Sequence, residues 1–107
     1  MAIYEKRTYD VIVGHMPEVI RLYEEEGWPA MVAGGHTDNL VGYFVSDTGR
    51  LHQLVHLWRF ADDAERRAFW ARLFADAEFM KFAIRLRPNV ASQDVQLLTS
   101  APWGPQP

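Results

Sequence analysis

The 107-residue sequence contains no cysteine. Disulfide frameworks and thiolate chemistry are therefore excluded. The chain also lacks any run approaching the ~18 consecutive apolar residues that a membrane-spanning helix needs. Its first residues, MAIYEKRTYD, include charged side chains at once, which is not typical of a signal peptide. We therefore expect a cytoplasmic protein that does not associate with a membrane.

The chain also lacks a strong net charge of either sign. The formal net charge is −3 at neutral pH, and no cluster of Lys and Arg stands out, so no nucleic acid is expected as a partner. The pair Gly34-Gly35 is too short for a nucleotide-binding loop, and no serine elbow is present. The absences thus exclude several enzyme classes without identifying one.

Aromatic residues, in contrast, are abundant, at 13% of the chain. A domain of this length leaves much of its surface exposed, so we expect part of the apolar surface to meet a ligand or a partner. Residues 1–100 are predicted to form one domain. The closing stretch SAPWGPQP has three prolines, which favours an extended, proline-rich arm over residues 101–107 that stays outside the core.

The order of predicted elements indicates a ferredoxin-like α+β fold, with a βαββαβ arrangement and both helices on one face of a four-stranded antiparallel sheet. Asp62 or Asp63 is expected to cap one helix and Asp76 the next. Residues 28–39 read as irregular because Gly34-Gly35 breaks a helix. The predicted strands cover residues 3–13, 40–46, 51–60 and 89–99. The first predicted helix covers 16–26, and the second consists of two pieces, 64–74 and 77–87.

The strand LHQLVHLWRF, Leu51 to Phe60, sends alternate side chains to opposite faces. We expect the face with Val55 and Leu57 at its centre to lie under the helices. The other face would then be bare, and a second copy of the sheet would cover it in a homodimer. The space enclosed by the two sheets would be lined by His52, His56 and Trp58 together with Glu5, Arg7 and Tyr9.

Three stretches resemble a known family. They are YEKRTYDVIVGHMPEVIRLYEEEG, then LVGYFVSDTGRLHQLVHLWRFADDAERRAFW, and finally the RP of LRPNV with the closing APW. In this order they resemble the NIPSNAP family of the dimeric α/β barrel superfamily. The resemblance implies a ferredoxin-like fold and a dimer whose sheets form a barrel, but no settled activity. Superfamily relatives include cofactor-free monooxygenases, polyketide cyclases, haem-degrading enzymes and dehydratases.

His56 is the first catalytic candidate, because a neutral imidazole can give or take a proton near pH 7. Tyr9 or Tyr43 is the second, since a phenol can donate a hydrogen bond to an enolate-like oxygen. The alternative for each is a structural role, as a histidine fixed by a neighbour or as a packed ring. Trp58 is expected to be an aromatic wall for a planar ligand or part of the packing.

Arg7 is expected to hold an anionic ligand or to pair with Glu5 on the same strand face. His52 and His36 complete the predicted ligand-binding set. His52 and His56 lie four residues apart on a strand, which is ~13 Å, so they cannot chelate one ion together and no metal is expected. No cofactor is expected either, although haem bound through His56 or His36 remains an alternative.

Two functions follow from these residues. The first is a cofactor-independent enzyme of the monooxygenase, cyclase or isomerase kind, acting on a small hydrophobic or aromatic compound. The second is a module that binds a ligand or a protein without catalysis. The enzymatic hypothesis depends partly on analogy between folds.

Overall fold

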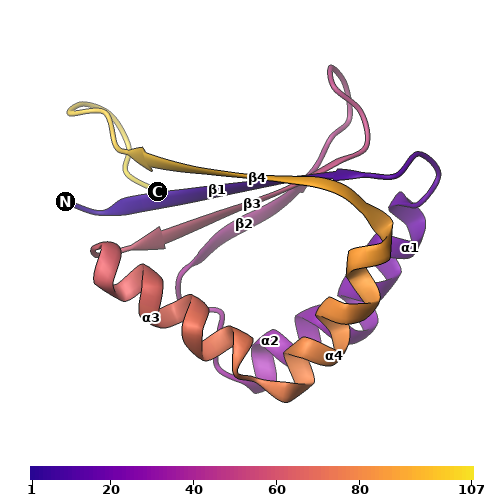
Figure 1. Ribbon diagram of the computed structural model, residues 1–107. Helices are drawn as coiled ribbons and strands as arrows, with labels where there is room; N and C mark the ends of the chain where they lie inside the picture. The colour runs from indigo at the N-terminus through magenta and orange to yellow at the C-terminus, as the bar shows by residue number, and fades with distance from the viewer.

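Four strands form one antiparallel sheet in the order β2-β3-β1-β4. In the computed structural model, which describes residues 1–107, the strands are β1 (Ile3–Val11), β2 (Leu40–Val45), β3 (Gln53–Phe60) and β4 (Val90–Thr99). The sheet forms one layer, and the helices all lie on one side of it (Figure 1). The predicted ferredoxin-like α+β fold is therefore confirmed. No helix is both long and apolar enough to cross a membrane.

The helices are α1 (Met16–Leu22), α2 (Trp28–Ala33), α3 (Asp63–Phe74) and α4 (Ala77–Leu86), with a short 3-10 turn, η2 (Arg87–Asn89), before β4. Both predicted caps are confirmed. The Asp62 carboxylate accepts a hydrogen bond from the Glu65 N–H over 2.8 Å, and the Asp76 carboxylate accepts from the N–H groups of Glu78 and Phe79.

The expectation that residues 28–39 are irregular was wrong for their first half, because the chain remains helical as far as Ala33. Between α1 and α2 lies a single π-helical turn, η1 (Tyr23–Gly27). A proline inside a regular α-helix lacks its N–H and clashes with the carbonyl four residues earlier. The wider π-helical turn directly before Pro29 makes room for that ring. The helix then ends at Gly34 and Gly35, and Gly35 has a φ of +70°.

The expected orientation of β3 was also wrong. His56, Trp58 and Phe60 are at most 4% exposed, and they face the helices of the same chain. Trp58 and Phe60 pack with Phe69 of α3 in one core cluster, and Leu54 packs with Val19, Leu22 and Phe82 in another. The bulkier apolar side chains lie on this face, so burying it removes more apolar surface from water than burying Val55 and Leu57.

The relationship between β1 and β3 agrees with the prediction. Glu5, Arg7 and Tyr9 lie opposite Trp58, His56 and Leu54 in the antiparallel register, and so they share the face that carries His56. The space that this face lines is therefore within one chain, between the sheet and the helices. It is not enclosed by two sheets.

Residues 100–107 leave the end of β4 and return toward the start of β1, outside both core clusters (Figure 1). The hydroxyl of Tyr4 donates a hydrogen bond to the carbonyl oxygen of Pro107 over 2.6 Å. Tyr4 lies on the sheet face that the helices leave uncovered, yet it is only 5% exposed. The arm thus covers one end of this face.

Candidate functional site

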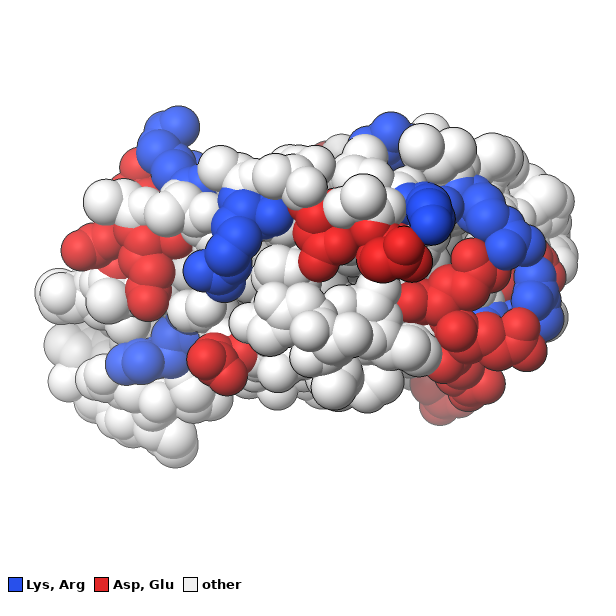
Figure 2. All heavy atoms as spheres, turned by 90° about the horizontal axis from the view of Figure 1, so that it is seen from below, with Lys and Arg blue, Asp and Glu red and all other residues white.

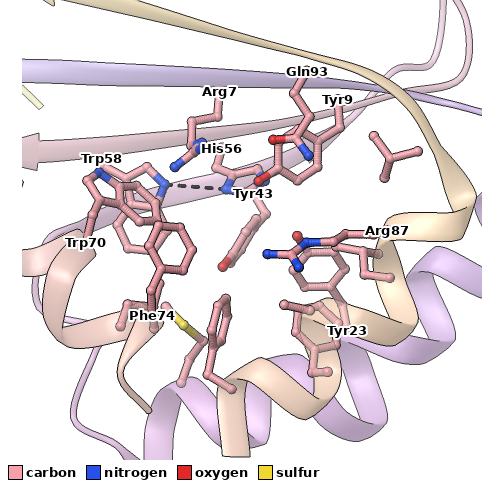
Figure 3. A pocket seen from close by; sticks show the side chains of 17 residues that line it. Arg7, Tyr9, Tyr23, Tyr43, His56, Trp58, Trp70, Phe74, Arg87 and Gln93 are labelled. Atoms are coloured by element: carbon pink, nitrogen blue, oxygen red, sulfur yellow. Dashed lines mark hydrogen bonds between the residues drawn. The ribbon is translucent and has the colours of Figure 1, made fainter. Parts of the chain in front are cut away.

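A cavity of about 90 Å³ lies between the sheet and the helices (Figure 3). Thirteen of its seventeen lining residues are hydrophobic. The sheet supplies Arg7 and Tyr9 from β1, Tyr43 from β2, and His56 and Trp58 from β3. Five of the eight residues that the sequence singled out therefore line one cavity, because alternate positions on three neighbouring strands point to the same side.

His56 lies at the centre of this group. Its ring centroid is 4.6 Å from that of Tyr9 and 5.0 Å from that of Tyr43. Burial, with a smaller contribution from the positive charge of Arg7, lowers the pKa of His56 to about 3. The imidazole is therefore neutral at physiological pH.

The tautomer of His56 follows from its neighbour. The indole N–H of Trp58 donates to Nδ1 of His56 over 3.4 Å, so the proton of the neutral ring lies on Nε2. This Nε2 is buried and has no hydrogen-bond partner in the protein. His56 is thus arranged as a hydrogen-bond donor, which differs from the acid/base role expected from the sequence.

Arg7 supplies a second donor. Its guanidinium lies over the ring of Trp70, 4.3 Å from the centroid, and its Nη1 is 3.6 Å from Oε2 of Glu5. Neither Nε of Arg7 nor Nε1 of Trp70 has a hydrogen-bond partner. Three buried nitrogen donors without acceptors therefore belong to residues that line one small cavity. Such groups are rare in folded proteins because each one left unmet is destabilising.

The tyrosines of the cavity are further donors. Burial raises the pKa of Tyr9, Tyr23 and Tyr43 above the ordinary value for a phenol. Their hydroxyls stay protonated at neutral pH and cannot act as bases there. The polar part of the lining is therefore rich in hydrogen-bond donors, and its two charged residues, Arg7 and Arg87, are both cations.

Glu5 lies outside the cavity. It is 1% exposed, and its Oε1 accepts a hydrogen bond from Nη1 of Arg66 over 2.8 Å. It lines a separate surface cleft of about 340 Å³ together with Arg7, Arg66, Arg67, Trp70 and Val95. Glu5 thus forms ion pairs with Arg7, which lines the cavity, and with Arg66, which lies in the cleft beside it.

His36 and His52 do not line the cavity either. The buried His36 contacts Asp76, with 2.8 Å between Nε2 and Oδ2, and so connects the loop after α2 to the start of α4. His52 lies in the loop before β3 with a φ of +61°. The regular alternation of β3 begins at Gln53, so it does not extend to His52.

The structure brings no three His, Cys, Asp or Glu side chains together as a metal site would require. The cavity is also far smaller than the roughly 300–1,000 Å³ of sites for drug-sized ligands. A haem macrocycle therefore does not fit beside His56 in this conformation.

Sequence reasoning missed four lining residues whose side chains carry a nitrogen or oxygen atom, namely Tyr23, Trp70, Arg87 and Gln93. Tyr23 was assigned to a core-facing helix stripe, which is where it lies. Trp70 and Arg87 carried no local signal, because the packing of α3 and η2 against the sheet decides where they point. Gln93 follows from the register alone, since it lies opposite Tyr9 on β4.

The comparisons with known proteins agree with this architecture. The family model of NIPSNAP matches residues 4–105. A NIPSNAP family protein from Agrobacterium tumefaciens is 31% identical, with a TM-score of 0.88 and coverage of 96% of this chain and 89% of that one. An uncharacterised NIPSNAP domain protein from Burkholderia xenovorans is 30% identical, with a TM-score of 0.85 and coverage of 97% and 99%.

A more distant likeness concerns the fold alone. An antibiotic biosynthesis monooxygenase shares 13% identity at a TM-score of 0.63, with coverage of 94% of this chain and 99% of that one. No curated protein matched the chain. The family model extends over nearly the whole sequence, from the second residue of β1 to beyond the end of β4, and includes the residues around the cavity. The chain therefore belongs to the NIPSNAP family.

Proposed function

We propose that this protein binds a small hydrophobic or aromatic molecule with at least one acceptor oxygen in the cavity between sheet and helices. The observation that carries the proposal is the set of unpartnered nitrogen donors on Arg7, His56 and Trp70 in a mostly hydrophobic lining. An acceptor oxygen on a ligand would satisfy these donors, while the ring or chain of the ligand would contact the aromatic walls.

The same arrangement defines the chemistry that a bound molecule would meet. Donors fixed around one oxygen stabilise negative charge that develops on it, as in an enolate or a phenolate. His56 and Arg7 would take this role, and Trp58 would be a wall. A cofactor-independent enzyme of the monooxygenase, cyclase or isomerase kind would use such stabilisation. A module without catalysis would use the same contacts for binding alone.

A thermal-unfolding screen of phenols, aromatic acids and quinones tests the proposal. A ligand that binds only the folded state adds about 2.7 kcal/mol of stability at a hundredfold excess over its dissociation constant. We expect at least one class to raise the Tm of wild-type protein and to lose most of that effect in His56→Gln. The matched control is His52→Asn, which changes a histidine outside the cavity to a residue that tolerates positive φ.

If no class raises the Tm of wild type, or if both variants respond as wild type does, the cavity is not the binding site. For a compound that does bind in the cavity, a turnover assay by absorbance or mass spectrometry separates an enzyme from a binding module.

We also propose a homodimer. The sheet face away from the helices carries Val55, Leu57 and Phe44, and Phe44 is 55% exposed. A second copy would remove this apolar surface from water. Light scattering should give twice the 12.3 kDa mass of one chain, and Leu57→Glu should reduce the mass to one chain. A single-chain mass for wild type at micromolar concentration would contradict the dimer.

A further inference from the structure

A second hollow lies beside the cavity. It is a surface groove of about 310 Å³ between the α1–η1 segment and the edge strand β2, and seven of its eight lining residues are hydrophobic. Trp28 is 42% exposed and Val45 is 48% exposed, so the groove leaves large apolar side chains in contact with water. Glu24 is its only charged lining residue.

Two tyrosines separate the groove from the cavity. Tyr23 and Tyr43 line both hollows, and their ring centroids lie 5.5 Å apart. The side chains of these two residues thus lie at the boundary between the two spaces. We infer that a change in the rotamer of either ring would join the two spaces.

The opposite side of the cavity has a different character. Arg7 and Trp70 line both the cavity and the surface cleft that contains Glu5, Arg66 and Arg67. Figure 2 shows that Lys and Arg are intermixed with Asp and Glu over the helical side of the molecule, without a broad area of one sign. The positive charge that a ligand in the cavity would meet therefore comes from individual arginines, Arg7 on this side and Arg87 of η2 elsewhere in the lining.

The register of the sheet places these features in one row. Val95, Arg7, His56 and Tyr43 lie opposite one another on β4, β1, β3 and β2 in that order. Two strand spacings separate Arg7 from Tyr43, which is about 10 Å. Polarity therefore changes across the sheet, from the arginines near β4 to the apolar groove beside β2.

From this row we propose that the ligand is an amphiphile with an acidic head and an apolar tail. Its carboxylate binds Arg7 and Nε2 of His56, and its tail passes between Tyr23 and Tyr43 into the groove. The cavity alone is too small for a drug-sized ligand, whereas cavity and groove together reach the roughly 300–1,000 Å³ of such sites. The inference depends on the proposed function, since it assigns the head of the ligand to the same cavity.

Straight-chain carboxylates of increasing length test the proposal. Butanoate, octanoate and dodecanoate are titrated into the full chain below the concentrations at which they form micelles, with benzoate and dodecanol as further probes. We expect the Kd to fall about fourfold for each methylene that enters the groove, as long as further methylenes are buried. Dodecanol, which lacks the charge, should bind more weakly than dodecanoate.

Val45→Glu introduces a charge into the groove at a half-exposed position, so the fold should tolerate it. It should remove the gain from chain length and leave the binding of benzoate unchanged. Val32→Glu is the matched control, because Val32 is 54% exposed and lines neither hollow. This control should bind every probe as wild type does.

The outcomes separate the two proposals. If benzoate binds in a manner sensitive to His56→Gln, but longer chains bind no better, the amphiphile is wrong and the cavity site stands. Equal Kd values for dodecanol and dodecanoate would also contradict the proposal that the ligand has an acidic head. If neither the carboxylates nor the phenols of the thermal screen bind, the cavity site falls too.

Discussion

The indole N–H of Trp58 donates a hydrogen bond to Nδ1 of His56 over 3.4 Å, two positions away on the same face of β3. This bond keeps the proton of the neutral imidazole on Nε2, next to the cavity. A residue that looks from the sequence like a general base is thereby a donor to whatever the cavity holds. Catalysis at this site would depend on holding negative charge, with no proton removed by His56.

The low pKa of His56 makes the folded protein sensitive to acid. The folded pKa is about 3, below the ordinary value of 6.5, so between these values only the unfolded chain takes up the proton. The stabilisation is present above pH 6.5 and is lost as the pH falls toward 3. Going from pH 7 to pH 5 should therefore remove about 2 kcal/mol of unfolding free energy through this group.

Urea unfolding of wild type and His56→Gln at both pH values measures this effect. The variant should lose about 2 kcal/mol less than wild type over the same interval, because every other titrating group is common to both. Parallel losses in the two proteins would show that His56 is not buried in its neutral form.

Glu5 should be important for stability, because it is a buried carboxylate between Arg66 and Arg7. Removing one partner of a buried ion pair typically costs ~3–5 kcal/mol, and we expect Glu5→Ala to fall at the lower end since Arg66 can turn toward water. Glu78→Ala is the control, since Glu78 pairs with Lys81 on an exposed helix surface. Chemical denaturation should show no measurable change for this control, and an equally mild effect for Glu5→Ala would contradict a structural role.

Asp76 makes two contacts, so its removal should lower the free energy of unfolding by more than the loss of a helix cap alone. Asp62→Ala removes only the cap of α3, which typically costs about 1 kcal/mol. Asp76→Ala removes the cap of α4 and also leaves the buried Nε2 of His36 without its partner, which adds roughly 1–3 kcal/mol. Asp76→Asn keeps both contacts possible and should be milder. Equal unfolding free energies for Asp62→Ala and Asp76→Ala would show that the contact with His36 adds nothing.

Gly27 lies against the ring of Phe82, where a Cβ would come within 2.6 Å of the ring atoms. Phe82 is 2% exposed and contacts Tyr23, so it has little room to move. Gly27→Ala should therefore cost about 1–3 kcal/mol through overpacking. The double variant Gly27→Ala, Phe82→Leu should be more stable than the sum of the two single effects implies, as thermal or urea unfolding can measure. Additive effects would mean that the two residues do not compete for the same space.

The order of elements and the helix caps could be predicted from the sequence because they depend on local signals. Asp62 and Asp76 each lie directly before a stretch of helix-forming residues, and the turn before β3 contains Gly49, whose φ is +74°. The shared face of Arg7 and His56 also followed from alternation along two strands. These features need no knowledge of what packs against the sheet.

The direction in which the His56 face points could not be derived in the same way. Alternation separates two faces, but the helices that pack on the sheet decide which face is buried, and two histidines made the buried face of β3 look exposed. The helical state of Trp28–Ala33 was missed for a related reason: Pro29 and the glycines that follow are local signals for a loop, and tertiary packing outweighed them. Trp70 entered the site only through the docking of α3.

The π-helical turn at Tyr23–Gly27 makes the number of residues in this segment matter as much as their identity. Because such a turn holds about one residue more than a turn of α-helix, it absorbs an extra residue while α1 and α2 keep their faces in phase. Deleting one residue there would convert the turn to ordinary α-helix without rotating α1 against α2, but it would bring the Pro29 ring against the carbonyl four residues earlier. A second deletion would have no wider turn to absorb it and would rotate α1 by about 100° relative to α2.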